Sequence, residues 1–283
     1  MGNVIRMDFY RLRRSLSFKI CIITVLAFNL INGPLEKLIF NISKALVKND
    51  PEALEKLGEY NNVYHLGNNI ASPLNSFCLV IFMLCIVWFC YADLQHGFIK
   101  NIAGQLPSRG HTVISKFIVI MVVTLIFMIA ACAGDTIGHL IIGDSLHTDL
   151  VYYGLDGDPD KVFTMGEACI EFAVKWVLGV GVCCIILLFT TGFSSNVAGT
   201  IIAVVCGGGL TSAVYLGIST GINSIFGLEG TKKIAVGDYM PDSLLHSNLT
   251  EDGAITTAAS VGAATVFVLL YCTVKLFNKK DVK

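Results

Sequence analysis

The run Phe117-Ile-Val-Ile-Met-Val-Val-Thr-Leu-Ile-Phe-Met-Ile-Ala-Ala-Cys-Ala-Gly134 lies between Lys116 and Asp135 and contains no charged residue. A helix that crosses a bilayer needs roughly 20 mostly apolar residues, so this run predicts a membrane span. Five further stretches of the same kind punctuate the chain. We predict six spans, at about residues 17–38, 72–92, 116–134, 169–190, 197–222 and 254–277.

Acidic and basic residues alternate between the gaps that separate these stretches. Eighteen of the 21 Asp and Glu residues fall in three alternate intervals, Glu36 to Glu59, Asp135 to Glu171 and Glu229 to Asp252. The other gaps and both tails hold three acids but 12 of the 20 Lys and Arg residues. Lys and Arg are retained on the cytoplasmic side of a membrane, whereas acids contribute little to orientation. We therefore predict that both termini are cytoplasmic.

The composition indicates one membrane domain. Of 283 residues, 54% are hydrophobic and 14% are charged, with a mean hydropathy of +0.69, whereas a soluble domain is about 25% charged. The whole chain, residues 1–283, is predicted to form a single all-α polytopic domain. The net charge of −1 gives no indication of a nucleic-acid partner. The ten cysteines lie mostly in apolar stretches and form no CxxC pair, which favours packing over disulfides or a metal site.

The N-terminal segment is basic and amphipathic. Apolar residues recur at helical spacing, and the arginines lie mostly around the other face. This pattern predicts a short helix over residues 3–15 that lies on the inner membrane surface, with a flexible basic tail as the alternative. Near the outer end of the first span, Gly33-Pro34 predicts a bend or an early exit. The residues of the expected apolar face are Ile5, Phe9, Leu12 and Leu16.

The fifth predicted span is rich in small residues, which let membrane helices approach closely. Three consecutive glycines also weaken a helix by roughly 1 kcal/mol each relative to Ala. One interpretation is a helix that packs at a subunit or pathway interface and can bend, and the alternative is tight packing inside one subunit. The candidate residues are Gly207, Gly208, Gly209, Ser212, Gly217 and Gly221.

The most specific motif lies between the second and third spans, from Tyr91-Ala-Asp-Leu-Gln-His-Gly-Phe-Ile-Lys-Asn-Ile102 to Lys116. It resembles the ABC-2 type permeases of bacterial ABC exporters. In that family an acidic residue ends the second span, followed by Gly, Ile-Lys-Asn, a Ser-Arg pair and a Ser-Lys that opens the third span. The matching residues are Asp93, Gly97, Ile99, Lys100, Asn101, Ser108, Arg109, Ser115 and Lys116.

A second stretch, Met7-Asp-Phe-Tyr-Arg-Leu-Arg-Arg14, is similar to the opening helix of the same family. Detailed matching covers residues 5–20 and 91–117, and Pro107 departs from the family's pattern. The chain is most similar to permeases that serve bacteriocin self-protection and the export of small amphipathic peptides.

The resemblance implies a multi-pass permease subunit of a bacterial cell membrane that works with two cytoplasmic ATPase subunits. ATP and Mg²⁺ would bind those subunits, with no cofactor on this chain, which lacks the GxxxxGK[ST] pattern. Six helices make half of such a membrane core, so we expect a second copy or a homologous permease. The expected substrate is an amphipathic or antimicrobial peptide, or a similar hydrophobic compound.

The residues of segment 93–116 suit a coupling role in their own right. Gly97 removes bulk where a helix must turn, and Lys100 and Arg109 offer positive charge to a partner. An ATPase could grip this coupling segment and move the second and third spans. The alternative is an ordinary solvated loop with cytoplasmic Lys and Arg. For the whole chain, the alternative function is a non-transporting membrane anchor or sensor for cytoplasmic partners.

Three other residue patterns could be mistaken for functional sites. Gly217-Ile-Ser-Thr-Gly221 fits G-x-S-x-G, but a nucleophile elbow needs a strand-to-helix turn, and this pattern ends an apolar helix. Asp135 and His139 could relay protons or line a polar exit at the outer end of span three, or be polar residues satisfied by neighbours. Glu171 and Lys175 have the spacing of an intrahelical ion pair near the outer mouth of span four. We predict neither catalysis nor a metal site.

Overall fold

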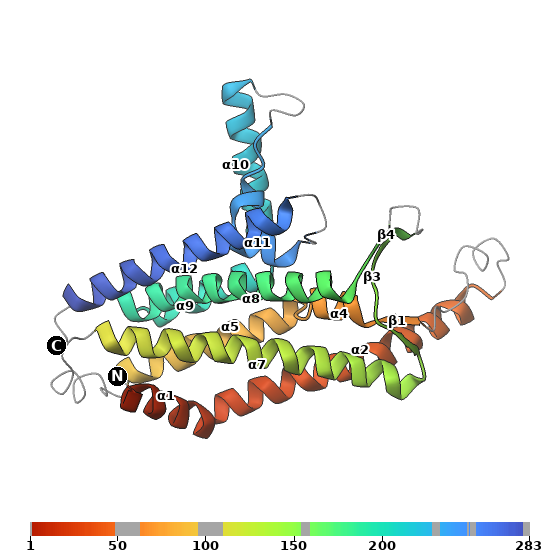
Figure 1. Cartoon of the computed structure of the whole chain (residues 1–283), viewed down its shortest axis with the longest axis horizontal. Helices are drawn as coiled ribbons and strands as arrows, with labels where there is room; N and C mark the ends of the chain where they lie inside the picture. Colours follow the sequence, from red (N-terminus) through yellow and green to blue (C-terminus); the bar gives the residue numbers. More distant parts are fainter. Residues whose placement is uncertain are drawn as a thin grey trace. The chain divides into compact units, whose positions relative to one another are not determined.

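The computed structural model describes residues 2–48, 63–95, 110–153, 159–227, 233–247, 249 and 253–279. The described chain is mostly helical (Figure 1). It divides into two compact units. Unit 1 combines Met1–Ile22, Leu74–Met128 and Ala173–Lys283, and unit 2 combines Ile23–Pro73 and Ile129–Phe172.

Five helical segments of the described chain are long and apolar enough to cross a membrane. The sixth predicted span is a bent pair of helices, which passes the same test only when its two parts are joined. The prediction of a mostly helical chain with several helices long and apolar enough to cross a membrane is therefore confirmed, with five such helices in the described chain, or six if the bent pair is one span. The five are α2 (Leu16–Leu46), α5 (Ser76–Gln95, preceded by the short α4, Leu66–Ala71), α7 (Gly110–Ile142), α8 (Met165–Leu187) and α12 (Ala254–Lys279).

The first predicted span does not end at Gly33-Pro34, and the bend expected there stays a prediction. Helix α2 continues through Pro34 to Leu46. Proline has no N–H to donate to the carbonyl four residues earlier, which here belongs to Leu30. Gly138 of α7 packs against this carbonyl, since a Cβ added at Gly138 would lie 2.5 Å from Leu30 O. Helix α7 thus passes close to the carbonyl that Pro34 leaves without its helical donor.

Predicted span 197–222 is not one straight helix. Helix α9 (Asn196–Gly207) and helix α10 (Thr211–Phe226) meet at 78°, and α10 projects away from α9 in Figure 1. Gly209 has a φ of +70°, a backbone angle that residues other than glycine rarely adopt. The predicted weakness of the triple glycine is confirmed, and the prediction of a continuous helix is corrected.

Unit 1 has an aromatic and aliphatic core. The ring of Phe127 in α7 lies 5.2 Å from that of Phe82 in α5 and 6.0 Å from that of Phe18 at the start of α2. Helix α9 packs along α5, with Gly207 so close that an added Cβ would lie 3.0 Å from the Val80 backbone. After α8, the π-helical turn η1 (Leu188–Gly192) leads to α9, and η3 (Val236–Tyr239) and α11 (Pro241–His246) follow α10.

Unit 2 contains strands, which the all-α prediction did not include. β1 (Val63–His65) pairs in parallel with β2 (Ser145–His147), and β3 (Leu150–Tyr153) pairs antiparallel with β4 (Pro159–Phe163). Asn68 links α4 to β3, because its side chain donates to Val151 O and accepts from Val151 N, both at 2.7 Å. These strands are three to five residues long and lack strict alternation, so their pairing depends on distant segments.

Both terminal helices of the described chain meet the beginning of α7 within unit 1. Helix α1 (Gly2–Arg14) is bonded there through Asp8 and Ser115. A Cβ added at Gly110 would lie 2.9 Å from Val274 Cγ1 in the last turns of α12. The first and last helices thus share one end of unit 1, while their placement in the cytoplasm stays a prediction.

Candidate functional site

Most predicted coupling residues lie outside the described chain; these are Gly97, Ile99, Lys100, Asn101, Ser108 and Arg109. Asp93 lies in the last turn of α5, and Ser115 and Lys116 lie in the second turn of α7. Both ends of segment 93–116 are therefore helical, since α5 continues to Gln95 and α7 begins at Gly110. Any force on the segment would act directly on these two helices.

A buried charge cluster ties α1 to α7. Ser115 Oγ donates a hydrogen bond of 2.5 Å to Asp8 Oδ2, and Asp8 is only 3% exposed. Arg11 Nη1 lies 4.0 Å from Asp8 Oδ1. Lys116 is also buried, with its Nζ 4.7 Å from the centre of the Phe89 ring in α5. An unpaired buried charge would cost several kcal/mol, so these partners fix α1 against α5 and α7.

Asp8 has no role predicted from its sequence context. Two signals could have found it: Asp8 is the single acid before Glu36, and it shares a helical stripe with Val4 and Leu12. That stripe is the buried side of α1 and shares Leu12 with the predicted apolar face, whose Ile5 and Phe9 are half-buried. Leu16, expected on the apolar face, is 70% exposed at the start of α2.

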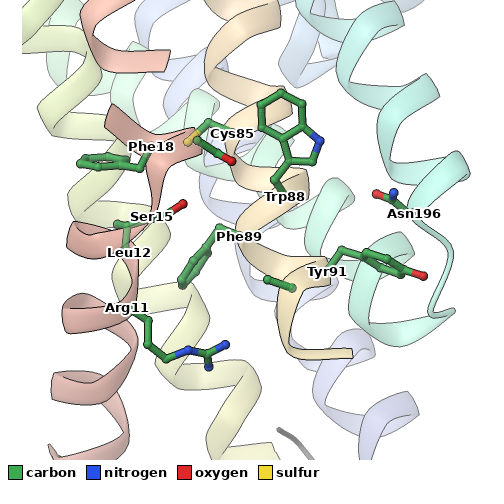
Figure 2. Close-up of a pocket in the computed structure, with 11 residues that line it drawn as sticks. Arg11, Leu12, Ser15, Phe18, Cys85, Trp88, Phe89, Tyr91 and Asn196 are labelled. Carbon is green, nitrogen blue, oxygen red and sulfur yellow. The ribbon is translucent and has the colours of Figure 1, made fainter. Parts of the chain in front are cut away.

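A cavity of about 500 Å³ lies next to this cluster. Figure 2 shows Arg11 and Ser15 extending toward α5, with the amide of Asn196 on the opposite side. The wall is formed by the end of α1, the first turn of α2, the last half of α5 and the first residue of α9. The lining residues are Arg11, Leu12, Ser15, Ser17, Phe18, Cys85, Trp88, Phe89, Tyr91, Ala92 and Asn196.

Unit 2 contains a polar group that includes the predicted Asp135 and His139. Tyr64 Oη donates to Asp135 Oδ2 at 2.8 Å, and Asn32 Nδ2 donates to Asp135 Oδ1 at 3.3 Å. The Tyr64 ring stacks on His139 at 4.2 Å between centroids, and His139 Nδ1 lies 2.8 Å from Asp144 Oδ2. The two residues are thus held by neighbours, and no direct bond between them is needed to organise the group.

The electrostatics of this polar group affect Tyr64 strongly. Burial raises the pKa of the Tyr64 hydroxyl well above its usual range, and the charge of Asp135 raises it further. Tyr64 therefore remains a neutral donor to Asp135 at any physiological pH. Tyr64 and Asp144 were not predicted from the sequence, because they join the group from β1 and from the turn after α7.

The candidate pathway residues fall in two environments. Gly207, Gly208 and Gly209 pack against the described chain, where Gly209 lies beside the His246 ring. Ser212 is exposed at the start of α10. A Cβ added at Gly217 or Gly221 would meet no described heavy atom within 4 Å. Among these candidate glycines, Gly217 and Gly221 are the ones that leave room for a neighbouring helix.

The remaining candidates are buried. Glu171 and Lys175 of α8 are each 2% exposed, and α8 begins at Met165, so both lie beyond the first turn of the helix. Ser219 lies within α10, where its hydroxyl donates to Tyr215 O at 2.7 Å and accepts from Val236 N at 2.9 Å. Its surroundings are those of a helix interior and not of a nucleophile elbow.

Comparison with models of known protein families finds no match to this chain, and a search of curated proteins finds no significant relative. Among the described residues, no group of three or more His, Cys, Asp or Glu side chains is arranged to hold a metal ion.

Proposed function

We propose that this chain is the membrane permease subunit of an ATP-driven exporter of the ABC-2 type. Two copies, or one copy and a homologous permease, would form the pathway, and two ATPase subunits would act on segment 93–116. The proposed substrate is an amphipathic or antimicrobial peptide, or a similar hydrophobic compound, which leaves a bacterial cell or its membrane.

The observation that carries the proposal is the hydrogen bond between Asp8 and Ser115. Each residue belongs to one of the two stretches that resemble the family, and the two stretches are far apart in the sequence. Their direct contact supports the view that they form one functional element. The contact favours a mechanism in which movement of the coupling segment reaches α1 as well as α5 and α7.

The bent pair of α9 and α10 supports the dimeric part of the proposal. Gly217 and Gly221 are four residues apart on α10, and they face open space with respect to the described chain. Apolar side chains on the same helix are also exposed, including Leu216 at 71% and Ile225 at 80%. A second permease would cover such a surface, since small residues permit close helix contact.

The test is ATP-dependent substrate movement by the chain reconstituted in proteoliposomes with its cognate ATPase. Gly97→Trp should abolish transport and leave the spans folded, because bulk in the coupling segment would prevent the ATPase from docking. Gly2→Trp is a matched control, because Gly2 is exposed at the start of α1 and an added Cβ meets nothing within 4 Å.

Full transport by Gly97→Trp would contradict the coupling role. The alternative function, a non-transporting anchor or sensor, predicts binding of cytoplasmic partners with no ATP-dependent flux in the same proteoliposomes. Flux that is lost in Gly97→Trp and retained in Gly2→Trp would exclude it.

A further inference from the structure

The cavity shown in Figure 2 is lined by one arginine and by several aromatic side chains. Arg11 is the one charged residue among its described lining residues. Arg11 lies 4.0 Å from the carboxylate of Asp8, and the ring of Phe89, which also lines the cavity, lies 4.7 Å from Lys116 Nζ, measured to the ring centre. The side chains around the cavity therefore favour an anion over a cation.

Two helices also begin at the cavity. Ser15 directly precedes α2, Ser17 and Phe18 lie in its first turn, and Asn196 is the first residue of α9. The first N–H groups of a helix have no partner within the helix and carry partial positive charge. Their field adds to that of Arg11, and the hydroxyls of Ser15 and Ser17 are further hydrogen-bond donors for an anionic oxygen.

Aromatic side chains also line the cavity. Phe18, Trp88, Phe89 and Tyr91 line it, and Trp88 is 47% exposed although it lies in an apolar helix. Trp and Tyr are enriched where lipid meets water, because their rings are apolar and their tips are polar. The volume of about 500 Å³ is in the usual range for small-molecule sites.

Asn196 provides a polar atom without a partner. Its Oδ1 is buried and accepts no hydrogen bond from any described residue. A buried acceptor that stays unpaired costs about 1–3 kcal/mol, so this oxygen would be stabilised by a ligand that donates a hydrogen bond. A hydroxyl on the ligand's polar head would supply it.

We propose that this cavity binds the head group of an anionic phospholipid in which the alcohol esterified to the phosphate carries a free hydroxyl. The phosphate lies near Arg11 and the first turn of α2, the hydroxyl donates to Asn196 Oδ1, and the acyl chains leave past Trp88. This proposal does not depend on ATP-driven transport, and failure of the transport assay would not affect it.

Fluorescence of Trp88 provides the test. The chain has two tryptophans, and Trp176 is the other, with its indole N–H bonded to Met121 O. In the full-length Trp176→Phe protein in detergent micelles, Trp88 is the sole indole. Phosphatidylglycerol with brominated acyl chains should quench it at a lipid fraction roughly tenfold lower than brominated phosphatidylcholine, the preference expected from one charge-assisted hydrogen bond.

Arg11→Gln should remove this preference, whereas Arg13→Gln should retain it, because Arg13 is exposed on the same helix and does not line the cavity. Ala92→Phe, which fills the cavity without removing a charge, should also remove the preference. Ala213→Phe is its control at an exposed position of α10. Should Arg11→Gln fail to fold, as judged by circular dichroism and gel filtration, Ala92→Phe decides the question.

Three results would overturn the proposal. One is equal quenching of Trp88 by the two lipids, and another is an unchanged preference in folded Arg11→Gln or Ala92→Phe protein. The third is reversal of quenching by inorganic phosphate at the same concentration as the lipid, which would assign the cavity to free phosphate. Failure of phosphate to compete, together with loss of preference in the variants, supports a lipid site.

Discussion

Two GxxxG pairs of this chain have the same spacing and opposite surroundings. Gly134 and Gly138 of α7 pack against α2, where added Cβ atoms would lie 2.8 Å from Leu26 O and 2.5 Å from Leu30 O. Gly217 and Gly221 of α10 meet no described atom within 4 Å. The spacing permits two helices to approach, but it does not say whether a helix is there.

The packed pair is accompanied by polar side chains that fix the same two helices. Asn32 of α2 bonds to Asp135 of α7, and Lys37 Nζ donates to Ile142 O at 3.0 Å, at the C-terminal end of α7. A cation at this end of a helix is favourable, because the last carbonyls carry partial negative charge. The α10 region has its own Tyr–Asp pair, Tyr215 and Asp242, but most of the surface of α10 is exposed.

The largest expected effect is that of Gly138→Leu. Its side chain would collide with the backbone of α2, which cannot move without disturbing the helix, and overpacking of this kind costs about 3 kcal/mol. Unfolding by SDS titration in mixed micelles measures the loss. Gly217→Leu is the matched control and should change stability by less than about 1 kcal/mol, since it only alters helix propensity. Equal losses of stability in both variants would show that the two glycine pairs do not differ in how closely they are packed.

The second effect concerns the bend between α9 and α10. Gly209→Ala strains a residue at φ +70° by about 1 kcal/mol and favours a continuous helix by about 1 kcal/mol. We expect it to shift the pair toward one straight span. Spin labels on unnatural residues at exposed positions 201 and 226 report this, because a continuous helix separates their Cα atoms by about 38 Å.

In the protein with Gly209 intact, the label distance should be clearly shorter than this value. Gly217→Ala serves as the control, since it raises helix propensity within α10 and leaves the bend untouched. An unchanged distance distribution in Gly209→Ala would show that tertiary contacts, and not the glycine, hold the bend.

A third comparison uses the two Tyr–Asp pairs. Tyr64→Phe removes the 2.8 Å bond to Asp135 in a buried site and should lower the free energy of unfolding by about 1.5 kcal/mol. Tyr215→Phe removes bonds of 2.9 and 3.1 Å to Asp242, but Tyr215 is only half-buried, so about 1 kcal/mol is expected. The same SDS titration measures both. A larger loss of stability in Tyr215→Phe than in Tyr64→Phe would show that the Tyr–Asp pair of the α10 region contributes more to stability.

The smallest effect is an alkaline loss of stability in unit 2. Burial and Asp135 raise the pKa of Tyr64 above its unfolded value, so the neutral form is favoured in the folded chain. This contribution is complete below a pH of about 10 and declines as the pH rises beyond it, by less than about 1 kcal/mol at pH 10.5. Stability measured between pH 9 and pH 10.5 should decline less in Tyr64→Phe than in the unmodified chain. Parallel curves would contradict the assignment.

The helical spans were predictable because apolar runs of about 20 residues have few alternatives in a bilayer. The bend at Gly207-Gly208-Gly209 was also foreseeable from the propensity of glycine. The continuation of α2 through Pro34 was not, since proline usually kinks or ends a helix. The paired strands of unit 2 were missed because their segments are short and their partners are distant in the sequence.

The candidate site was predicted only in part. Ser115 and Lys116 were matched as part of the coupling segment, but their partners Asp8 and Phe89 became evident only when α1, α5 and α7 were seen together. The cavity beside them could not be predicted at all, since it combines residues from α1, α2, α5 and α9.

The sequence by itself determined that this chain contains helices long and apolar enough to cross a membrane, because twenty consecutive apolar residues satisfy their backbone only as a helix in lipid. Tertiary structure alone decided which of two identical glycine pairs is packed, how a proline is accommodated inside α2, and where the acid of α1 finds its partner. Those outcomes depend on atoms brought together from distant parts of the chain, and spacing along one helix carries no information about what faces it.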